Sequence, residues 1–457
     1  MLLISVKKKV LIIFSIIFLI FAGATVYGAL ILTQDGIYKG VSIEDIDLSG
    51  IEKEIAAELV AQKMNEKLAG KKIVLKGIDN SWTIDPGDIS LQYVAEDAIE
   101  KAYRAGRDGN ILKRIQEIFR LRKDGINFTC DLTFNKEQLK NILTIIKKQV
   151  DKQEKNASLS YRNGEIAKTP EVVGVYLDVD KSFDAIEKNI LDKNFEVNTL
   201  VINEVTPHIT MNGIQNINGV IAEFRTYFST AAENRAHNIR LACEKINNTI
   251  LMPKDAFSMN KGIGPRTPEN GYKTAPIILK DEFVEDVGGG VCQVTTTLYC
   301  AALLARLNIT QRAPHSLPLG YVPPSHDATI SGDYIDLKFE NSLEDAVAIN
   351  AEVSGGTICI RILGNNDMQK NIVKLRSEIV ETYEAKVEVI IDNTLPVNEK
   401  VIVKAPQNGL KSRLFRDTYD VNGKLLKSEL ISEDVYNAVN GQIKINENFK
   451  EDQSGVL

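Results

Sequence analysis

The sequence lacks any long block of like charge and any pair of closely spaced cysteines, although it is 457 residues long. Its 61 acidic and 55 basic residues are interleaved and leave a net charge of -6, so no stretch is suited to neutralising a nucleic-acid backbone. The five cysteines are scattered and form no Cys-x-x-Cys motif, which argues against a disulfide framework and a cysteine zinc site. We therefore expect no nucleic-acid partner, no metal and no cofactor.

What is present is the composition of a folded protein. Hydrophobic residues make up 44% and charged residues 25% of the chain, values typical of globular proteins and not of disordered ones. The chain is also longer than a single hydrophobic core usually organises. The composition therefore predicts several folded domains.

The longest apolar run covers residues 10–32 and directly follows three lysines at positions 7–9. A helix of that length crosses a hydrocarbon core of about 30 Å. Lysines on its amino side place the N-terminus inside and the rest of the chain outside the cell membrane. We expect residues 1–33 to be a cytoplasmic tip and a retained anchor. The alternative is a cleaved signal peptide, with small residues at positions 22–24 as the cleavage site.

Beyond the anchor, short strand-like runs alternate with amphipathic helices. The pattern predicts helices that begin near Lys53 and directly after Asn135, the second with Asn135 as its cap. We interpret residues 34–125 and 126–207 as two small α+β modules. Residues 208–366 hold all four histidines and predict a central α+β domain that bears the site. Residues 367–457 are β-rich and look like a binding or spacer module.

The strongest candidate for chemistry is Cys292. Gly288, Gly289 and Gly290 precede it and allow the backbone to approach a ligand closely. Apolar residues recur at helical spacing after it, which places Cys292 at the start of a helix. Helix N-terminal amides favour a thiolate and stabilise an oxyanion, so the sequence predicts a cysteine nucleophile. The alternative is a buried inert thiol, as we expect for the other four cysteines.

A base for this nucleophile is available downstream. His315 lies on a proline-bounded loop, and either Asp327 or Asp336 would orient its ring as the third member of a triad. The alternative for His315 is a structural histidine. A metal site made from these groups is disfavoured, because no tight ligand spacing supports it. His208, His237 and His326 receive no role.

Several motifs in order resemble the VanW domain. They are Phe228-Ser229-Thr230, residues 234–239, Phe257-Ser258-Met259-Asn260, Gly264-Pro265-Arg266-Thr267, Gly271-Tyr272, residues 288–293, Thr296-Thr297-Leu298-Tyr299, His315-Ser316 and Asp327-Ala328-Thr329. His326 departs from the pattern before the last motif. The upstream region resembles peptidoglycan-binding modules, and the tail is similar to a small β-rich domain named for its five glycines.

The resemblance implies a wall-associated protein and, for members with this cysteine, an L,D-transpeptidase that forms 3-3 cross-links through a cysteine acyl-enzyme. Cys292 would be the nucleophile and peptidoglycan the partner. Residues 288–290 and Gln293 would line the substrate site, while Arg235 and Arg266 would hold substrate carboxylates or serve the structure. The alternatives are a wall-binding accessory protein without catalysis, as in glycopeptide resistance, and an amidase or carboxypeptidase that uses water.

Overall fold

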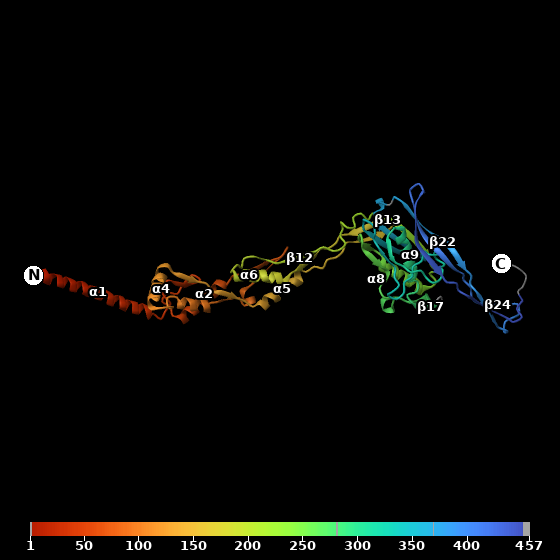
Figure 1. The fold of residues 1–457 in the computed structure, drawn as a ribbon. Helices are drawn as coiled ribbons and strands as arrows, with labels where there is room; N and C mark the ends of the chain where they lie inside the picture. Colours follow the sequence, from red (N-terminus) through yellow and green to blue (C-terminus); the bar gives the residue numbers. More distant parts are fainter. Residues whose placement is uncertain (1, 280–281, 369, 451–457) are drawn as a thin grey trace. The chain divides into compact units, whose positions relative to one another are not determined.

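The computed structural model describes residues 2–279, 282–368 and 370–450. It contains two compact units, drawn in Figure 1 with the chain coloured from red to blue. The first unit comprises Met1–Gln153 and Val173–Val205, and the second comprises Glu154–Val172 and Thr206–Leu457. Helices and strands alternate through both units, so the mixed α+β, multidomain class predicted from the sequence is confirmed.

The first unit begins with a long apolar helix. Its helices are α1 (Leu2–Leu32), α2 (Lys53–Leu68), η1 (Pro86–Ile89), α3 (Glu96–Arg104), α4 (Ile111–Asp124), α5 (Lys136–Val150) and α6 (Val179–Leu191). Within the described residues, α1 is the one helix that is long and apolar enough to cross a membrane, over Lys7–Leu32. Its length and composition suit a membrane anchor and a signal sequence alike.

The strands of this unit are short and form small sheets. They are β1 (Val41–Ile43), β2 (Ile46–Asp47), β3 (Ile73–Lys76), β4 (Ser81–Ile84), β5 (Gln92–Val94), β6 (Ile126–Phe128), β7 (Asp131–Thr133), β10 (Gly174–Leu177), β11 (Asn198–Thr199) and β12 (Ile202–Val205). β1 pairs in parallel with β6, β3 pairs in parallel with β11, and β5 pairs antiparallel with β7. Strands from before residue 125 therefore share sheets with strands from after it.

Two helix starts in this unit follow from the local sequence. α2 begins at Lys53, and the Asn135 side chain accepts hydrogen bonds from the backbone amides of Glu137 and Gln138 at the start of α5. Such a cap satisfies amides that have no partner within the helix. Both predicted helix starts are confirmed.

The second unit is built around one sheet and one buried helix. Its helices are α7 (Glu233–Ile246), α8 (Met259–Ile263), η2 (Pro268–Asn270), α9 (Val291–Leu304) and η3 (Asn366–Met368). Its first strands are β8 (Ser158–Arg162), β9 (Glu165–Thr169), β13 (Gly219–Tyr227), β14 (Thr249–Leu251), β15 (Ala256–Ser258), β16 (Thr274–Leu279), β17 (Glu282–Val287), β18 (Asn308–Gln311), β19 (Lys338–Glu340), β20 (Val347–Ser354) and β21 (Thr357–Gly364). The four-stranded sheet has the order β13-β21-β20-β14, and α7 and α9 pack on it.

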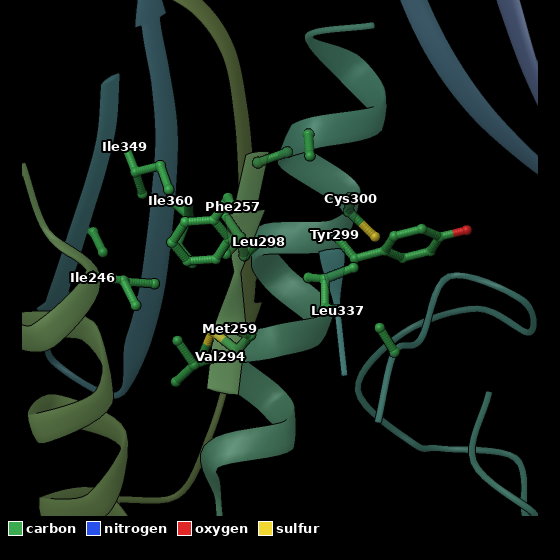
Figure 2. Packing of buried hydrophobic residues seen from close by; sticks show 14 of the residues in the cluster. Ile246, Phe257, Met259, Val294, Leu298, Tyr299, Cys300, Leu337, Ile349 and Ile360 are labelled. Carbon is green, nitrogen blue, oxygen red and sulfur yellow. The ribbon is translucent and has the colours of Figure 1, made fainter. Parts of the chain in front are cut away.

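Helix α9 lies at the centre of this core, since nearly all of its side chains are buried. Figure 2 shows Val294 and Leu298 on the side of α9 that faces Phe257 and Met259. On the other side of the helix, Tyr299 points away from Phe257 and is 1% exposed. A helix that is apolar on all faces is stable only when it is enclosed. Tyr299 is therefore a packing residue of this core.

The C-terminal part of the second unit consists of strands alone within the described residues. They are β22 (Ile372–Tyr383), β23 (Val387–Ile391), β24 (Lys400–Lys404), β25 (Gly409–Tyr419), β26 (Leu425–Tyr436) and β27 (Gly441–Ile445). β22, β25 and β26 form one antiparallel sheet, and β23, β27 and β24 form a second. Leu414 of β25 is fully buried in the same apolar cluster as α9, so the β22-β25-β26 sheet, hereafter the C-terminal sheet, shares the core of the central domain.

Candidate active site

The amino end of α9 carries the candidate nucleophile. Gly290 is the cap of the helix and has a φ of 103°, a conformation that favours glycine. Cys292 is the second residue of the helix, as the sequence predicted. A Cβ atom on Gly289 would lie 2.6 Å from the carbonyl oxygens of Ala275 and Pro276. Glycine at position 289 is therefore needed for the close packing of this turn against β16.

The backbone amides of the glycine turn are partly committed. Gly288 donates its amide hydrogen to the carbonyl oxygen of Lys273 at 3.1 Å, as part of the β16-β17 hairpin. The amides of Val291 and Gln293 donate to the carbonyl oxygens of Gly288 and Gly290. The Gly288 amide is therefore committed to the hairpin, and Gly288 itself lines the cavity.

The Cys292 side chain faces a cavity of about 450 Å³. Its sulfur lies 3.5 Å from the hydroxyl of Thr329 and 3.7 Å from the carbonyl oxygen of Ile330. The His315 side chain hydrogen-bonds the sulfur and lines the same cavity. Nucleophile and imidazole are thus brought together from α9 and from a loop more than twenty residues away.

The His315 ring is held by a buried carboxylate. Its Nδ1 lies 2.8 Å from Oδ2 of Asp327, and its backbone amide donates to the same oxygen at 2.6 Å. Because Nδ1 bonds Asp327, Nε2 is the ring nitrogen directed at the Cys292 sulfur. Asp336 instead accepts hydrogen bonds from Ser258 and Asn260 at the start of α8. The structure thereby places Asp327, and not Asp336, beside His315.

The loop that carries Asp327 is tied to α9 and to the His315 loop. Ala328 receives a hydrogen bond on its carbonyl oxygen from the Thr296 hydroxyl and donates its amide to the same hydroxyl, both at 3.1 Å. Thr329 donates its amide to the carbonyl oxygen of Ala313 at 2.9 Å. The Asp-Ala-Thr motif therefore supplies a carboxylate for His315, an anchor on α9 and a hydroxyl for Cys292.

The charges of this cluster stabilise one another. Burial by itself raises the pKa of the Cys292 thiol, but the hydrogen bond and charge of His315, with Thr329 and the Ile330 backbone, lower it to about 7. Burial lowers the pKa of His315, yet Asp327 and the Cys292 thiolate raise it to about 9. Burial raises the pKa of Asp327, but His315 and Arg312 keep it below its ordinary value. These opposite shifts favour a thiolate on Cys292 beside an imidazolium on His315.

The other four cysteines lie in the core, as expected. Cys130, Cys243, Cys300 and Cys359 are at most 6% exposed. Burial raises the pKa of all four thiols, to about 12 for Cys243 and to about 11 for Cys359. Cys292 alone among the five has a pKa shifted downward.

Two arginines line the cavity beside Cys292. Arg235 donates to Oε1 of Gln293 at 2.7 Å, and Arg266 donates to Oδ1 of Asn260 at 2.9 Å and to the carbonyl oxygen of Gly332 at 3.3 Å. Both guanidinium groups are therefore held in place by the protein while they border the cavity. Guanidinium groups fixed in this way suit the recognition of a carboxylate.

The Gln293 side chain lies in the wall of the cavity and is bonded to protein groups instead of pointing into the solvent. It is 2% exposed, and its amide nitrogen donates to the hydroxyl of Thr226 at 3.2 Å and to the carbonyl oxygen of Tyr227 at 2.9 Å. Its amide oxygen is used by Arg235. The side chain is therefore occupied by protein partners and holds Arg235 in place, and the contact of Gln293 with substrate stays a prediction.

The remaining histidines lie outside this cluster. His208 contacts Asp255, and His237 contacts the carbonyl oxygen of Gly271. His326 is 4% exposed and contacts the Ser377 hydroxyl at 3.0 Å. Among the residues that the structure describes, no group of three or more His, Cys, Asp or Glu side chains is arranged to hold a metal ion.

Several residues of the site were not identified from the sequence. Thr329 lies two residues after Asp327, and its place in a motif was the one available signal. Arg312 donates from Nε to the carbonyl oxygen of Asp327 at 2.7 Å and from a terminal nitrogen to Oδ1 at 3.3 Å. Tyr436 donates its hydroxyl to Asp327 Oδ1 at 2.5 Å. Tyr321 lines the cavity near Cys292. Local sequence gives no signal for Tyr436, which is 109 residues from Asp327.

Together these features describe a multidomain α+β protein with a cysteine, histidine and aspartate cluster at the start of a buried helix. Residues 234–363 match the family model described as "VanW like protein". Residues 82–198 match the "Putative peptidoglycan binding domain" and residues 375–446 match the G5 domain. The chain therefore contains a VanW-like region, a region like a putative peptidoglycan-binding domain and a C-terminal region like a G5 domain.

Two curated proteins resemble part of this chain. YoaR of Bacillus subtilis is 39% identical over 155 residues, which cover 34% of this chain and 51% of YoaR. The vancomycin B-type resistance protein VanW of Enterococcus faecalis is 30% identical over 117 residues, which cover 24% of this chain and 42% of that protein. The matches thus span about half or less of the length of these relatives. Among solved structures, the crystal structure of HP0197-G5 is 25% identical, with a TM-score of 0.12, over 17% of this chain and 97% of that one.

Proposed function

We propose that this protein is an extracytoplasmic peptidoglycan L,D-transpeptidase that forms 3-3 cross-links through an acyl-enzyme on Cys292. The observation that carries the proposal is the hydrogen-bonded series Cys292, His315 and Asp327 in the wall of a cavity of about 450 Å³. A thiolate paired with an imidazolium is the form in which a cysteine attacks a carbonyl carbon. The match to a peptidoglycan-binding domain supports stem peptides as the substrate class.

In the first step, the Cys292 thiolate attacks the carbonyl carbon of the third-position diaminopimelate in a donor tetrapeptide. A carbon-sulfur bond forms, and the carbonyl oxygen becomes an oxyanion near the amino end of α9. Collapse of this intermediate breaks the amide bond to D-Ala, while the His315 imidazolium gives its proton to the leaving amine. The products are a thioester on Cys292 and free D-Ala.

In the second step, the side-chain amine of a diaminopimelate from a neighbouring stem attacks the thioester. Neutral His315 accepts a proton from this amine, the new amide bond forms and the Cys292 thiolate leaves. Asp327 keeps the His315 ring oriented and stabilises its charged form throughout. Arg235 and Arg266 bind the carboxylates of the two stems at the cavity wall.

The location follows from the same proposal. Helix α1 anchors the chain in the cell membrane by a single pass, with its lysines at positions 7–9 on the cytoplasmic side. The peptidoglycan-binding domain over residues 82–198 then engages the wall outside the cell. This topology brings the cavity of the second unit to the compartment that contains its substrate.

A second candidate is a wall-binding accessory protein without catalysis. It is favoured by one observation, the match of residues 82–198 to a peptidoglycan-binding domain, which by itself accounts for a wall association. On this account Cys292 would react with thiol reagents but form no adduct with wall peptides.

The test is incubation of the full-length protein, in detergent micelles, with purified disaccharide tetrapeptides, followed by mass spectrometry of muropeptides and of the Cys292 peptide. A transpeptidase yields free D-Ala, a dimer with a 3-3 linkage and an acyl adduct on Cys292. Release of D-Ala without dimers indicates a carboxypeptidase and rejects the transfer step. Folded protein with a reactive Cys292 thiol and neither product nor adduct rejects catalysis and favours the accessory role.

A further inference from the structure

The C-terminal sheet reaches the candidate active site. Tyr436, the last residue of β26, is 1% exposed. Its hydroxyl donates to Oδ1 of Asp327 at 2.5 Å and accepts the backbone amide of Ser325 at 2.7 Å. Tyr436 thus binds the carboxylate oxygen that does not face His315, since the imidazole uses Oδ2. The C-terminal sheet therefore contributes the Tyr436 hydroxyl to Oδ1 of Asp327, while His315 bonds Oδ2.

A second contact from the same strand acts through Arg312. Asp434 of β26 accepts a hydrogen bond from Arg312 at 2.6 Å, and both side chains are at most 7% exposed. Arg312 in turn donates to the side chain and the backbone of Asp327. A buried guanidinium between two carboxylates is fixed by both of them. Removal of either carboxylate leaves Arg312 without half of its charge balance.

Further contacts join the C-terminal part of the chain to the loops that carry His315 and Asp327. The Ser325 and Ser412 hydroxyls lie 2.5 Å apart, and Asn437 donates its backbone amide to the carbonyl oxygen of Ser316, next to His315. Gln407 donates to the carbonyl oxygen of Pro318 and lines the cavity. These contacts therefore extend from the buried carboxylate of Asp327 to the cavity beside Cys292.

We propose that the G5 domain is a working part of the active site, in which Tyr436 and Asp434 are positioning residues that hold Asp327, and through it His315, against Cys292. This inference rests on the proposed function for its catalytic meaning. A spacer or wall-binding role for the G5 domain requires none of these contacts. Hydrogen bonds to a carboxylate fix its orientation, and loss of the Tyr436 hydroxyl leaves Oδ1 of Asp327 with the longer 3.3 Å bond from Arg312 alone.

The central test replaces Tyr436→Phe, which removes the hydroxyl and keeps the buried ring. Tyr383→Phe is the matched control, because Tyr383 lies in the same sheet and its hydroxyl bonds only the exposed side chain of Glu381 in the described residues. The readout is the pH dependence of Cys292 alkylation by iodoacetamide, followed on the Cys292 peptide by mass spectrometry. We expect the midpoint to rise by about one unit in Tyr436→Phe, which lowers the alkylation rate at pH 7 about fivefold. Tyr383→Phe keeps the wild-type midpoint.

Asp434→Asn provides a second variant, since it keeps the shape of the side chain and removes the charge opposite Arg312. The midpoint is expected to shift in the same direction. Circular dichroism establishes that each variant is folded. An unchanged midpoint in folded Tyr436→Phe, or in folded Asp434→Asn if the first variant does not fold, overturns the inference.

The same variants separate this inference from the proposed function. If the wild-type protein makes no cross-linked product but the alkylation midpoint shifts in Tyr436→Phe, the transpeptidase proposal fails and the positioning role stands. If the wild-type protein makes product and neither variant shifts the midpoint or lowers kcat, the positioning role fails and the transpeptidase proposal stands. With both correct, kcat falls about tenfold in Tyr436→Phe while KM stays within about twofold.

Discussion

The two cysteines of α9 have opposite chemical environments, although they lie on one helix. Cys292 is at the amino end, faces a cavity and contacts His315, and its pKa falls to about 7. Cys300 lies in the body of the helix with no exposed surface. Its thiol donates to the carbonyl oxygen of His326 at 3.1 Å, and burial raises its pKa well above the ordinary value.

The difference shows that burial does not decide the reactivity of these thiols. Burial acts to raise the pKa of both. At Cys292 the imidazole and a hydroxyl supply more stabilisation to the thiolate than burial removes. At Cys300 the neighbouring groups are a carbonyl oxygen and the charge of Asp327, which disfavour a thiolate. Arg312 also lowers the pKa of Cys300 but does not offset burial there, whereas His315 offsets burial at Cys292.

The largest expected effect on activity is that of removing the Cys292 thiol, with removal of the Cys300 thiol as the comparison. Cys292→Ala removes the nucleophile, and we expect formation of cross-linked muropeptides to fall by about 10⁴-fold or more. Cys300→Ala is the matched control and is expected to retain activity, because its thiol is enclosed in the core. Muropeptide analysis of both variants by mass spectrometry is the measurement. Equal product from Cys292→Ala and wild type would reject the assignment.

Loss of the imidazole is expected to make Cys292 resemble Cys300. In His315→Gln the thiolate loses its charged partner, so the pKa of Cys292 rises toward its ordinary value near 9 or beyond. Activity is expected to fall by about 10²- to 10⁴-fold, the usual contribution of a general acid-base group. Alkylation of Cys292 across pH gives the pKa. His237→Gln, outside the cavity, serves as the control, and an unchanged profile in His315→Gln would exclude the pairing.

A smaller effect is expected at the turn before α9. Gly289→Ala places a Cβ atom 2.6 Å from two backbone carbonyl oxygens, which cannot move as a flexible side chain does. We expect a loss of about 1 to 3 kcal/mol in the free energy of unfolding, measured by urea denaturation. Gly320→Ala is the control, because no atom lies within 4 Å of the added Cβ. The idea fails if both variants unfold at the same urea concentration.

The smallest expected effect is the pH dependence of the wild-type protein. Activity requires the Cys292 thiolate, which forms as pH rises through about 7, and the His315 imidazolium, which is lost as pH rises through about 9. The rate is therefore expected to follow a bell centred near pH 8, with about half of the maximum at pH 7. Steady-state rates between pH 5.5 and pH 10.5 provide the measurement. A rate that rises continuously through pH 9 and above would show that no ion pair is involved.

Local structure was predictable where neighbours in the sequence decide it. The start of α2 at Lys53, the Asn135 cap of α5 and the start of α9 beside Cys292 depend on helix periodicity and on contacts within a few residues. The boundaries of the five predicted segments remain predictions. Pairings such as β3 with β11 involve residues more than a hundred positions apart, which no local pattern reports.

Residue types and their order in the chain determined which groups were available: a cysteine before a helix, a histidine on a loop and two aspartates downstream. Only the tertiary structure decided that Asp327 and not Asp336 meets His315, that Gln293 is enclosed and that Tyr436 reaches the site from another domain. The physical reason is the separation along the chain of the residues that interact. Helix caps and turns are set by hydrogen bonds between near neighbours, whereas a thiolate is stabilised by charges that the whole fold brings within a few ångströms.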